Sequence, residues 1–340
     1  MDKKNRKNFL LLGVLLLGTI FIIVRHNRPV PYHTNTGLVF GTVYKITYQH
    51  ADDLAADIEQ ELKRFDGSLS TFNDTSTISR INRNEVVAHA DTLFLRVLRR
   101  SMEVSQQTDG AFDITVAPLV NAWGFGFKQN AFPDSAVIDS LRQLIGYTKI
   151  ALTPDGRVQK QDPRIMLDCS AIAKGYAVDV IADLLARKGA ANYMVDIGGE
   201  VVVHGVNAAG AWWRIGINKP VDDSLSVNNE LQTILQVSNV GIATSGNYRN
   251  FYYRGGRKYA HTIDPHTGYP VQHSILSATV VAHDCMTADA YATAFMVMGL
   301  EPAKAFLANH PELEAYFIYA DDESRDRVFH SPGMNRYIAK

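Results

Sequence analysis

The sequence has 340 residues, of which 46% are hydrophobic and 20% are charged, and its formal net charge is −1. The first 30 residues carry a net charge of +5, so the rest of the chain carries −6. This composition predicts a folded, mildly acidic body and argues against nucleic acid as a partner.

The N-terminal residues form a segment of their own. Basic residues precede a stretch from 9 to 24 that contains no charged residue, and Arg25 and Arg28 follow it. Residues 1–30 are therefore expected to be an uncleaved signal anchor, with a cleaved signal peptide as the alternative. Because the strongest basic cluster stays in the cytoplasm, the body should be exported and tethered on the periplasmic side of a bacterial inner membrane.

Beyond a short linker at 29–36, the hydrophobic pattern predicts helices and strands in runs rather than in strict alternation. Helices are expected at 52–65, 91–107, 134–144, 171–187, 287–299 and 302–309, with 70–82 irregular. Strands are expected at 37–49, 147–151, 158–160, 164–168, in several segments between 193 and 281, and in a last pair. This order favours an α+β fold: a single interwoven body with largely antiparallel sheets flanked by helices.

The stretch LDCSAIAKGYAVD (167–179) begins like a buried strand and continues as an amphipathic helix. Small residues surround Lys174 at the start of that helix. A helix N-terminus attracts anions, and a lysine in its first turn adds a full positive charge, so a phosphate group could bind there. The alternative is that the small residues only pack the helix onto a sheet and that Lys174 is solvated.

A second helix, within DCMTADAYATAFMVMG (284–299), carries Asp289 and Thr293 four residues apart, hence on one face. A carboxylate and a hydroxyl one turn apart can be two oxygen ligands of a hard cation such as Mg²⁺. The alternative is an aspartate and a threonine that only hydrogen-bond within the helix.

A third group lies in YAHTIDPHTGYP (259–270), where His261 precedes a tight turn. This histidine could be a general base, a phosphate donor or a buried hydrogen-bonded residue. Thr244 and Ser245 could likewise donate to an anion, with an ordinary turn as the alternative.

The exported body resembles the ApbE-like family, the FAD:protein FMN transferases once described as thiamine-biosynthesis lipoproteins. The resemblance rests on motifs that occur in the family's order: FGTVYKI, LSTFNDTSTISRIN, TDGAFDITVAPLVNAWGFG, LDCSAIAKGYAVD, VDIGGEVVVHG, ATSGNY, HTIDPHTGYP and DCMTADAYATAF. It implies an ApbE-like, T-fold-related domain over residues 37–340. It also implies an enzyme that uses Mg²⁺ and FAD, transfers FMN to a Ser or Thr hydroxyl of a flavoprotein, and releases AMP.

Carried over by motif, the resemblance implies metal ligation by the Ala171 carbonyl and the Asp289 and Thr293 side chains. Expected FAD contacts are Phe40, Phe72, Ala111, Phe112, Asp113, Asp168, Lys174, His261 and Ile263. His261, Lys174 and Asp289 are the expected catalytic residues, with His261 or Asp289 as general base. The sequence departs from the family at Phe40, commonly methionine, at Phe72, commonly tyrosine, and at Ala292, which is a second aspartate in some members.

Two further expectations stay open at this point. The same residues would also suit a metal-dependent FAD pyrophosphatase, in which water replaces the acceptor hydroxyl, or a membrane-tethered flavin carrier without catalysis. Cys169 and Cys285 each lie near an expected metal ligand, so we expect them to be close in space, whether or not they form a disulfide.

Overall fold

The structure is a computed structural model that describes residues 29–126, 132–222, 230–248, 250–323 and 325–339, together with Gly13, Leu16, Leu17 and Thr19. The expected anchor at 9–24 therefore lies mostly outside the described residues. Within the described part of the chain, no helix has both the length and the apolar character needed to cross a bilayer.

The centre of the fold is an eight-stranded sheet in which every neighbouring pair is antiparallel. Its strands, in spatial order, are β1 (Tyr32–Val39), β2 (Thr42–Gln49), β5 (Tyr193–Ile197), β6 (Glu200–His204), β9 (Val240–Gly246), β12 (Ile275–Ala282), β13 (Glu314–Ala320) and β14 (Asp326–His330). The sheet thus combines strands from both ends of the chain, and the expected α+β fold with antiparallel pairing is confirmed.

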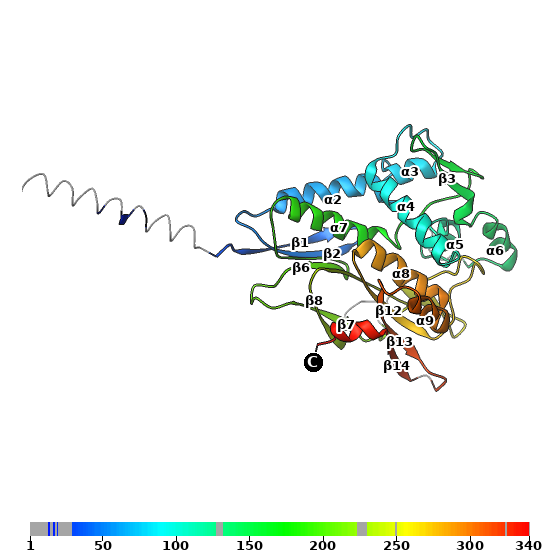
Figure 1. Cartoon of the computed structure of the whole chain (residues 1–340). Coiled ribbons are helices and arrows are strands. Elements are labelled where there is room, and N and C mark those ends of the chain that lie inside the picture. The colour runs from blue at the N-terminus through cyan, green and yellow to red at the C-terminus, as the bar shows by residue number, and fades with distance from the viewer. Residues whose placement is uncertain are drawn as a thin grey trace, which may run out of the picture.

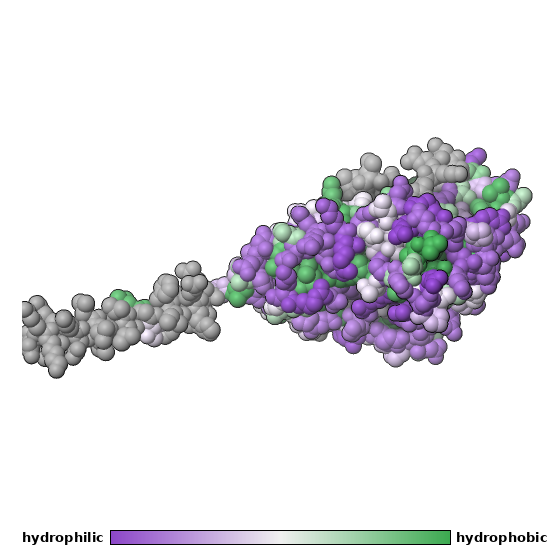
Figure 2. Space-filling view, turned by 90° about the horizontal axis from the view of Figure 1, so that it is seen from above, coloured by the Kyte–Doolittle hydropathy of each residue, from purple (hydrophilic) through white to green (hydrophobic). Residues whose placement is uncertain are grey.

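Helices cover one face of this sheet (Figure 1). α7 (Ala173–Arg187) lies against β5 and β6, and α8 (Cys285–Met298) lies beside it against β9 and β12. The other helices are α2 (Ala55–Leu69), α3 (Thr77–Asn82), α4 (Thr92–Gln107), α5 (Ala117–Ala122), α6 (Ser135–Arg142) and α9 (Leu300–Ala308). Among them, α2 packs on α7, and α4 and α9 pack on α8. The helix-side surface in Figure 2 is mostly hydrophilic with separate apolar patches, because the apolar faces of these helices point into the core.

A two-stranded ribbon, β7 (Trp213–Asn218) and β8 (Leu231–Val237), covers the opposite face. Trp213, Ile217 and Leu235 pack there with Val201 and Val203 of β6. Two smaller ribbons pair β3 (Ile150–Leu152) with β4 (Val158–Lys160) and β10 (Phe251–Arg254) with β11 (Arg257–Ala260). Short 3₁₀ turns lie at Tyr147–Lys149 and Pro332–Arg336.

Most predicted helices appear within two residues of their expected ends, and their caps explain why. Asp91 accepts hydrogen bonds from the Leu93 and Phe94 backbone N–H groups at 3.0 and 3.1 Å, as expected of an N-cap. Asp134 and Asp284 cap α6 and α8 in the same way. These side chains satisfy backbone donors that a helix N-terminus leaves unpaired.

Several local expectations are wrong. The single strand expected at 37–49 is two strands, β1 and β2, and the helix expected at 52–65 runs from Ala55 to Leu69. Residues 29–36 are not a linker, because β1 begins at Tyr32 and forms a hairpin with β2 through a turn at Phe40 and Gly41, both with positive φ. The irregular segment 70–82 contains α3, which Ser76 caps. No strand forms at 164–168, where the backbone instead bonds to the Asn82 side chain.

Candidate active site

A cavity of about 540 Å³ opens where α7, α8, the β5–β6 turn and the end of β9 meet the loops around residues 71, 113 and 168. All predicted site residues except Phe40 line this cavity: Phe72, Ala111, Phe112, Asp113, Asp168, Ala171, Lys174, His261, Ile263, Asp289 and Thr293. Its volume is in the range of small-molecule sites. The fold therefore gathers residues that are up to 221 positions apart, from Phe72 to Thr293, around one space.

Phe40 is the predicted contact that the structure places elsewhere. It occupies the β1–β2 turn with a φ of 51°. Its ring packs against Phe65 of α2, with centroids 5.3 Å apart, and it is partly buried in the main core. Phe40 thus contributes to packing rather than to the wall of the cavity.

Lys174 lies in the first turn of α7 and forms an ion pair with Glu200 of β6. The Lys174 side chain keeps 34% of its surface exposed, whereas Glu200 keeps 4%. Burial alone would lower the pKa of Lys174, but the Glu200 and Asp289 carboxylates hold that pKa above its usual value. Lys174 is therefore a cation at neutral pH, and it lines the cavity together with its partner Glu200.

Asp289 is a buried carboxylate on α8, 4% exposed. Its Oδ2 accepts a hydrogen bond from the Gly175 backbone N–H at 2.9 Å. Burial raises the pKa of Asp289, and the nearby Lys174 charge opposes that rise. One turn further along α8, Thr293 shares a 3.1 Å hydrogen bond with Ser245 of β9.

These groups fit a hard cation. Ala171, Asp289 and Thr293 line the cavity together and offer a carbonyl, a carboxylate and a hydroxyl oxygen, which are the donors Mg²⁺ takes. No cluster of three or more His, Cys, Asp or Glu side chains suited to a metal occurs among the residues described.

His261 follows β11 and lines the cavity. Its Nδ1 is buried and has no hydrogen-bond partner within the described structure. Burial lowers the pKa of His261, so the imidazole is neutral near pH 7 and can accept a proton. Phe125 approaches the ring edge-on, with centroids 6.5 Å apart.

Asp113 and Asp168 organise the loops of the cavity. Asp113 accepts hydrogen bonds from the Thr115 N–H and hydroxyl through Oδ1 and from the Tyr147 N–H through Oδ2. Asp168 accepts from the Ser170 N–H at 2.8 Å and from the Ser170 hydroxyl. Both carboxylates thus shape the backbone that meets a ligand.

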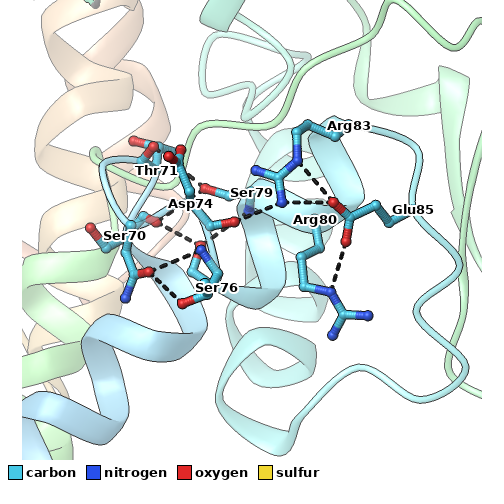
Figure 3. A network of polar contacts seen from close by, with 10 residues as sticks. Ser70, Thr71, Asp74, Ser76, Ser79, Arg80, Arg83 and Glu85 are labelled. Carbon is cyan, nitrogen blue, oxygen red and sulfur yellow. Dashed lines mark hydrogen bonds and ion pairs between the residues drawn. The ribbon is translucent and has the colours of Figure 1, made fainter.

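Figure 3 shows the braced loop between α2 and α3. Phe72, which belongs to this loop, is 81% exposed. The loop is held by hydrogen bonds from the Ser76 and Ser79 hydroxyls to the Ser70 carbonyl, and by the Arg83 guanidinium to the Asp74 carbonyl. An exposed aromatic ring on a fixed loop at the rim of a cavity is suited to stack on a planar ligand.

Sequence reasoning did not single out several residues of this site, among them Glu200 and Asn82. Glu200 lies 26 positions after Lys174, and its only signal was its place in the VDIGGEVVVHG motif. Asn82 lines the cavity and pairs with both backbone groups of Leu167, at 2.9 and 2.7 Å. Neither pairing leaves a periodic pattern in the sequence.

The two cysteines are buried free thiols, so no disulfide joins them. Cys285 donates to the Ile242 carbonyl at 3.2 Å and lies at the start of α8. Burial raises the pKa of both thiols. The expectation that the two cysteines lie close together stays a prediction.

The chain is similar to known proteins over most of its length. Residues 40–317 match the sequence model of the ApbE family. The chain is 37% identical to the FAD:protein FMN transferase of Vibrio cholerae over 86% of this chain and 89% of that protein. It is 32% identical to the Escherichia coli K12 protein of the same name, over 95% and 96%.

Solved structures give the same match. The flavin transferase ApbE from Vibrio cholerae superimposes with a TM-score of 0.80 at 35% identity, covering 91% of this chain and all of that one. The apo flavinyl transferase ApbE of Pseudomonas stutzeri also gives a TM-score of 0.80, at 30% identity, over 91% and 97%.

Proposed function

Because the chain belongs to the ApbE family and is an FAD:protein FMN transferase, we propose that it moves FMN from FAD to a Ser or Thr hydroxyl of an acceptor protein, uses Mg²⁺ and releases AMP. The observation that carries the proposal is that Lys174, Asp289 and His261, from three different elements, face one cavity. Phosphoryl transfer depends on positioning and charge stabilisation more than on covalent catalysis. Lys174, Asp289 and His261 together would supply both.

The roles of the charged residues follow from their surroundings. Asp289, Thr293 and the Ala171 carbonyl would hold Mg²⁺, which would neutralise charge on the diphosphate when bound. Lys174 faces the same space with a full positive charge and stabilises the charge that builds up as the P–O bond breaks. Phe72 offers its ring to one of the planar ends of FAD.

The acceptor hydroxyl oxygen forms a bond to the FMN phosphorus, and the bond from that phosphorus to the bridging oxygen breaks. AMP leaves with the bridging oxygen, and the hydroxyl proton goes to His261. His261 suits this role because its buried imidazole is neutral near pH 7. Asp289 is the second candidate for the proton, but its Oδ2 already accepts the Gly175 N–H.

The proposal is tested by incubating the full chain with FAD, Mg²⁺ and candidate exported flavoprotein subunits. Covalent flavin is read as in-gel fluorescence of the acceptor, and nucleotides are separated by chromatography. We expect flavin-labelled acceptor and one AMP per flavin transferred, and no transfer by a His261→Asn control. Free FMN with AMP in every mixture would instead indicate a pyrophosphatase, and unchanged FAD would indicate a carrier.

We also propose that residues 1–30 tether the enzyme to the periplasmic side of the inner membrane, near membrane flavoproteins. The support is the uncharged stretch at 9–24 with its preceding basic cluster. The protein should fractionate with membranes, and its N-terminal peptide should be recovered by mass spectrometry. A soluble exported product that begins after about residue 25 would contradict the anchor and favour a cleaved signal peptide.

A further inference from the structure

Glu200 is set in the cavity wall by the turn that precedes it. Gly198 and Gly199 connect β5 to β6 with φ values of 67° and 99°, a region that favours glycine, and both line the cavity. Val201 and Val203 point to the far side of the sheet. Because strand side chains alternate, Glu200 points to the helix side, where Lys174 begins α7.

The surroundings of Glu200 make an ionised carboxylate there unfavourable in free energy. The residue is 3% exposed, and its Oε2 is buried with no hydrogen-bond partner within the described structure. Its Oε1 accepts from Lys174. A buried ion pair adds little stability over an apolar pair of the same size, so stability alone does not account for a glutamate here.

We propose that Glu200 is a positioning residue that holds the Lys174 ammonium against the cavity wall, where it can meet the FAD diphosphate. The inference rests on the proposed function of the cavity. A lysine side chain has four rotatable bonds, and it loses much of its catalytic effect when its ammonium group is not held in one position. Glu200 holds that charged group through its ion pair with Lys174, so the ammonium is in place before the substrate arrives.

The first test measures the reactivity of the Lys174 amine, which depends on its pairing with Glu200, without any substrate. The full chain is treated with an amine-acylating ester, and the modification rate of Lys174 is followed by peptide mass spectrometry. Glu200→Gln removes the counter-charge that keeps the amine protonated, so this rate should rise at least about threefold. Glu200→Asp, which keeps the charge on a shorter side chain, should raise this rate by a smaller but still measurable amount.

The second test measures turnover as AMP release from FAD with Mg²⁺ and an acceptor. Glu200→Gln should lower kcat by roughly 10- to 100-fold with a much smaller change in the KM for FAD. Glu200→Asp should recover part of kcat. In the Lys174→Met background, Glu200→Gln should cost nothing further, because Glu200 acts through the lysine.

Glu314→Gln is the matched control. Glu314 is also a buried glutamate, 9% exposed, paired with Arg336 and bonded to Ser331, but it does not line the cavity. It should leave both Lys174 acylation and kcat unchanged, whatever it does to the melting temperature.

The inference is overturned if Glu200→Gln leaves Lys174 acylation or kcat within about twofold of wild type, or if its cost persists without Lys174. Should Glu200→Gln fail to fold, Glu200→Asp decides, because a shortened side chain must still shift both readouts. A wild type that releases no AMP with any acceptor would refute the proposed function, and the acylation rates would still decide the role of Glu200.

Discussion

Gly175 of α7 and Asp289 of α8 meet so closely that no side chain fits between them. The Gly175 N–H donates to Asp289 Oδ2 at 2.9 Å. A Cβ at position 175 would lie 2.4 Å from the Cys285 carbonyl oxygen and 2.7 Å from the Asp289 Cβ. The small residues around Lys174 therefore serve two purposes, because they let α8 approach the start of α7 as well as opening the cavity.

Gly175→Ala should destabilise the protein, because the new methyl group has no room against the α8 backbone. We expect a loss of about 1–3 kcal/mol in the free energy of unfolding, together with weakened Mg²⁺ dependence as Asp289 shifts. Gly67→Ala is the matched control, since Gly67 lies in α2 and a Cβ there would meet nothing within 4 Å. It should stabilise by about 0.4–1 kcal/mol. Equal melting temperatures for both variants would contradict the contact.

Asp289→Asn and Asp289→Ala separate the charge of Asp289 from its hydrogen bond. The amide keeps an oxygen for the Gly175 N–H, so Asp289→Asn should melt near the wild type but lose roughly 100-fold or more in AMP release. Asp289→Ala leaves that N–H buried and unpaired, which should cost about 1–3 kcal/mol in stability. Thermal unfolding and Mg²⁺ titration of turnover check both, and full activity of either variant would rule out the metal assignment.

Phe72→Ala should weaken FAD binding without weakening the fold. The ring is 81% exposed, so its removal takes little from the core. The loss of one stacking contact is worth about 0.5–1.5 kcal/mol, or roughly a two- to tenfold rise in the FAD dissociation constant. Flavin fluorescence titration measures it. Val86→Ala, at an 83% exposed position outside the cavity, should leave the affinity unchanged.

The stability of the ligand-free protein should depend on pH through Glu200. Burial raises the pKa of Glu200 to about 7, from an ordinary value of 4.5, although the Lys174 charge opposes that rise. Glu200 is therefore increasingly the carboxylate that pairs with Lys174 as the pH rises through about 7, and below that pH the folded state binds its proton more tightly than the unfolded chain. The stabilisation is complete below the unfolded pKa and is lost as the pH rises through about 7. Between these values the wild type should lose more in melting temperature than Glu200→Gln, which cannot titrate. Parallel melting curves would count against a buried, titrating Glu200.

Features that depend on neighbours within one turn of helix are predictable from the sequence. Asp289 and Thr293 share a face of α8 because they are four residues apart, and both do line the cavity. The Asp91 cap is predictable for the same reason, since its partners are two and three residues away. Here the sequence spacing itself determines the geometry.

Features that depend on partners far away in the sequence are not predictable from it. The pairing of Lys174 with Glu200 requires α7 to lie on β6, and nothing near either residue specifies this. The pattern over β1 resembles a linker because β1 is an edge strand with polar residues and little burial. The motif around Phe40 suggests a site residue, but the turn directs its ring onto Phe65.

Asn82 and Lys160 have a consequence for how the cavity can open. The Asn82 side chain forms hydrogen bonds with both the N–H and the carbonyl of Leu167. The Lys160 ammonium donates to the Ile81 carbonyl at 3.1 Å and to the Ile165 carbonyl at 3.0 Å. The end of α3, next to the Phe72 loop, is thereby tied to the segment that leads into Asp168. These two parts of the cavity lining should therefore move as one rigid unit when a ligand binds.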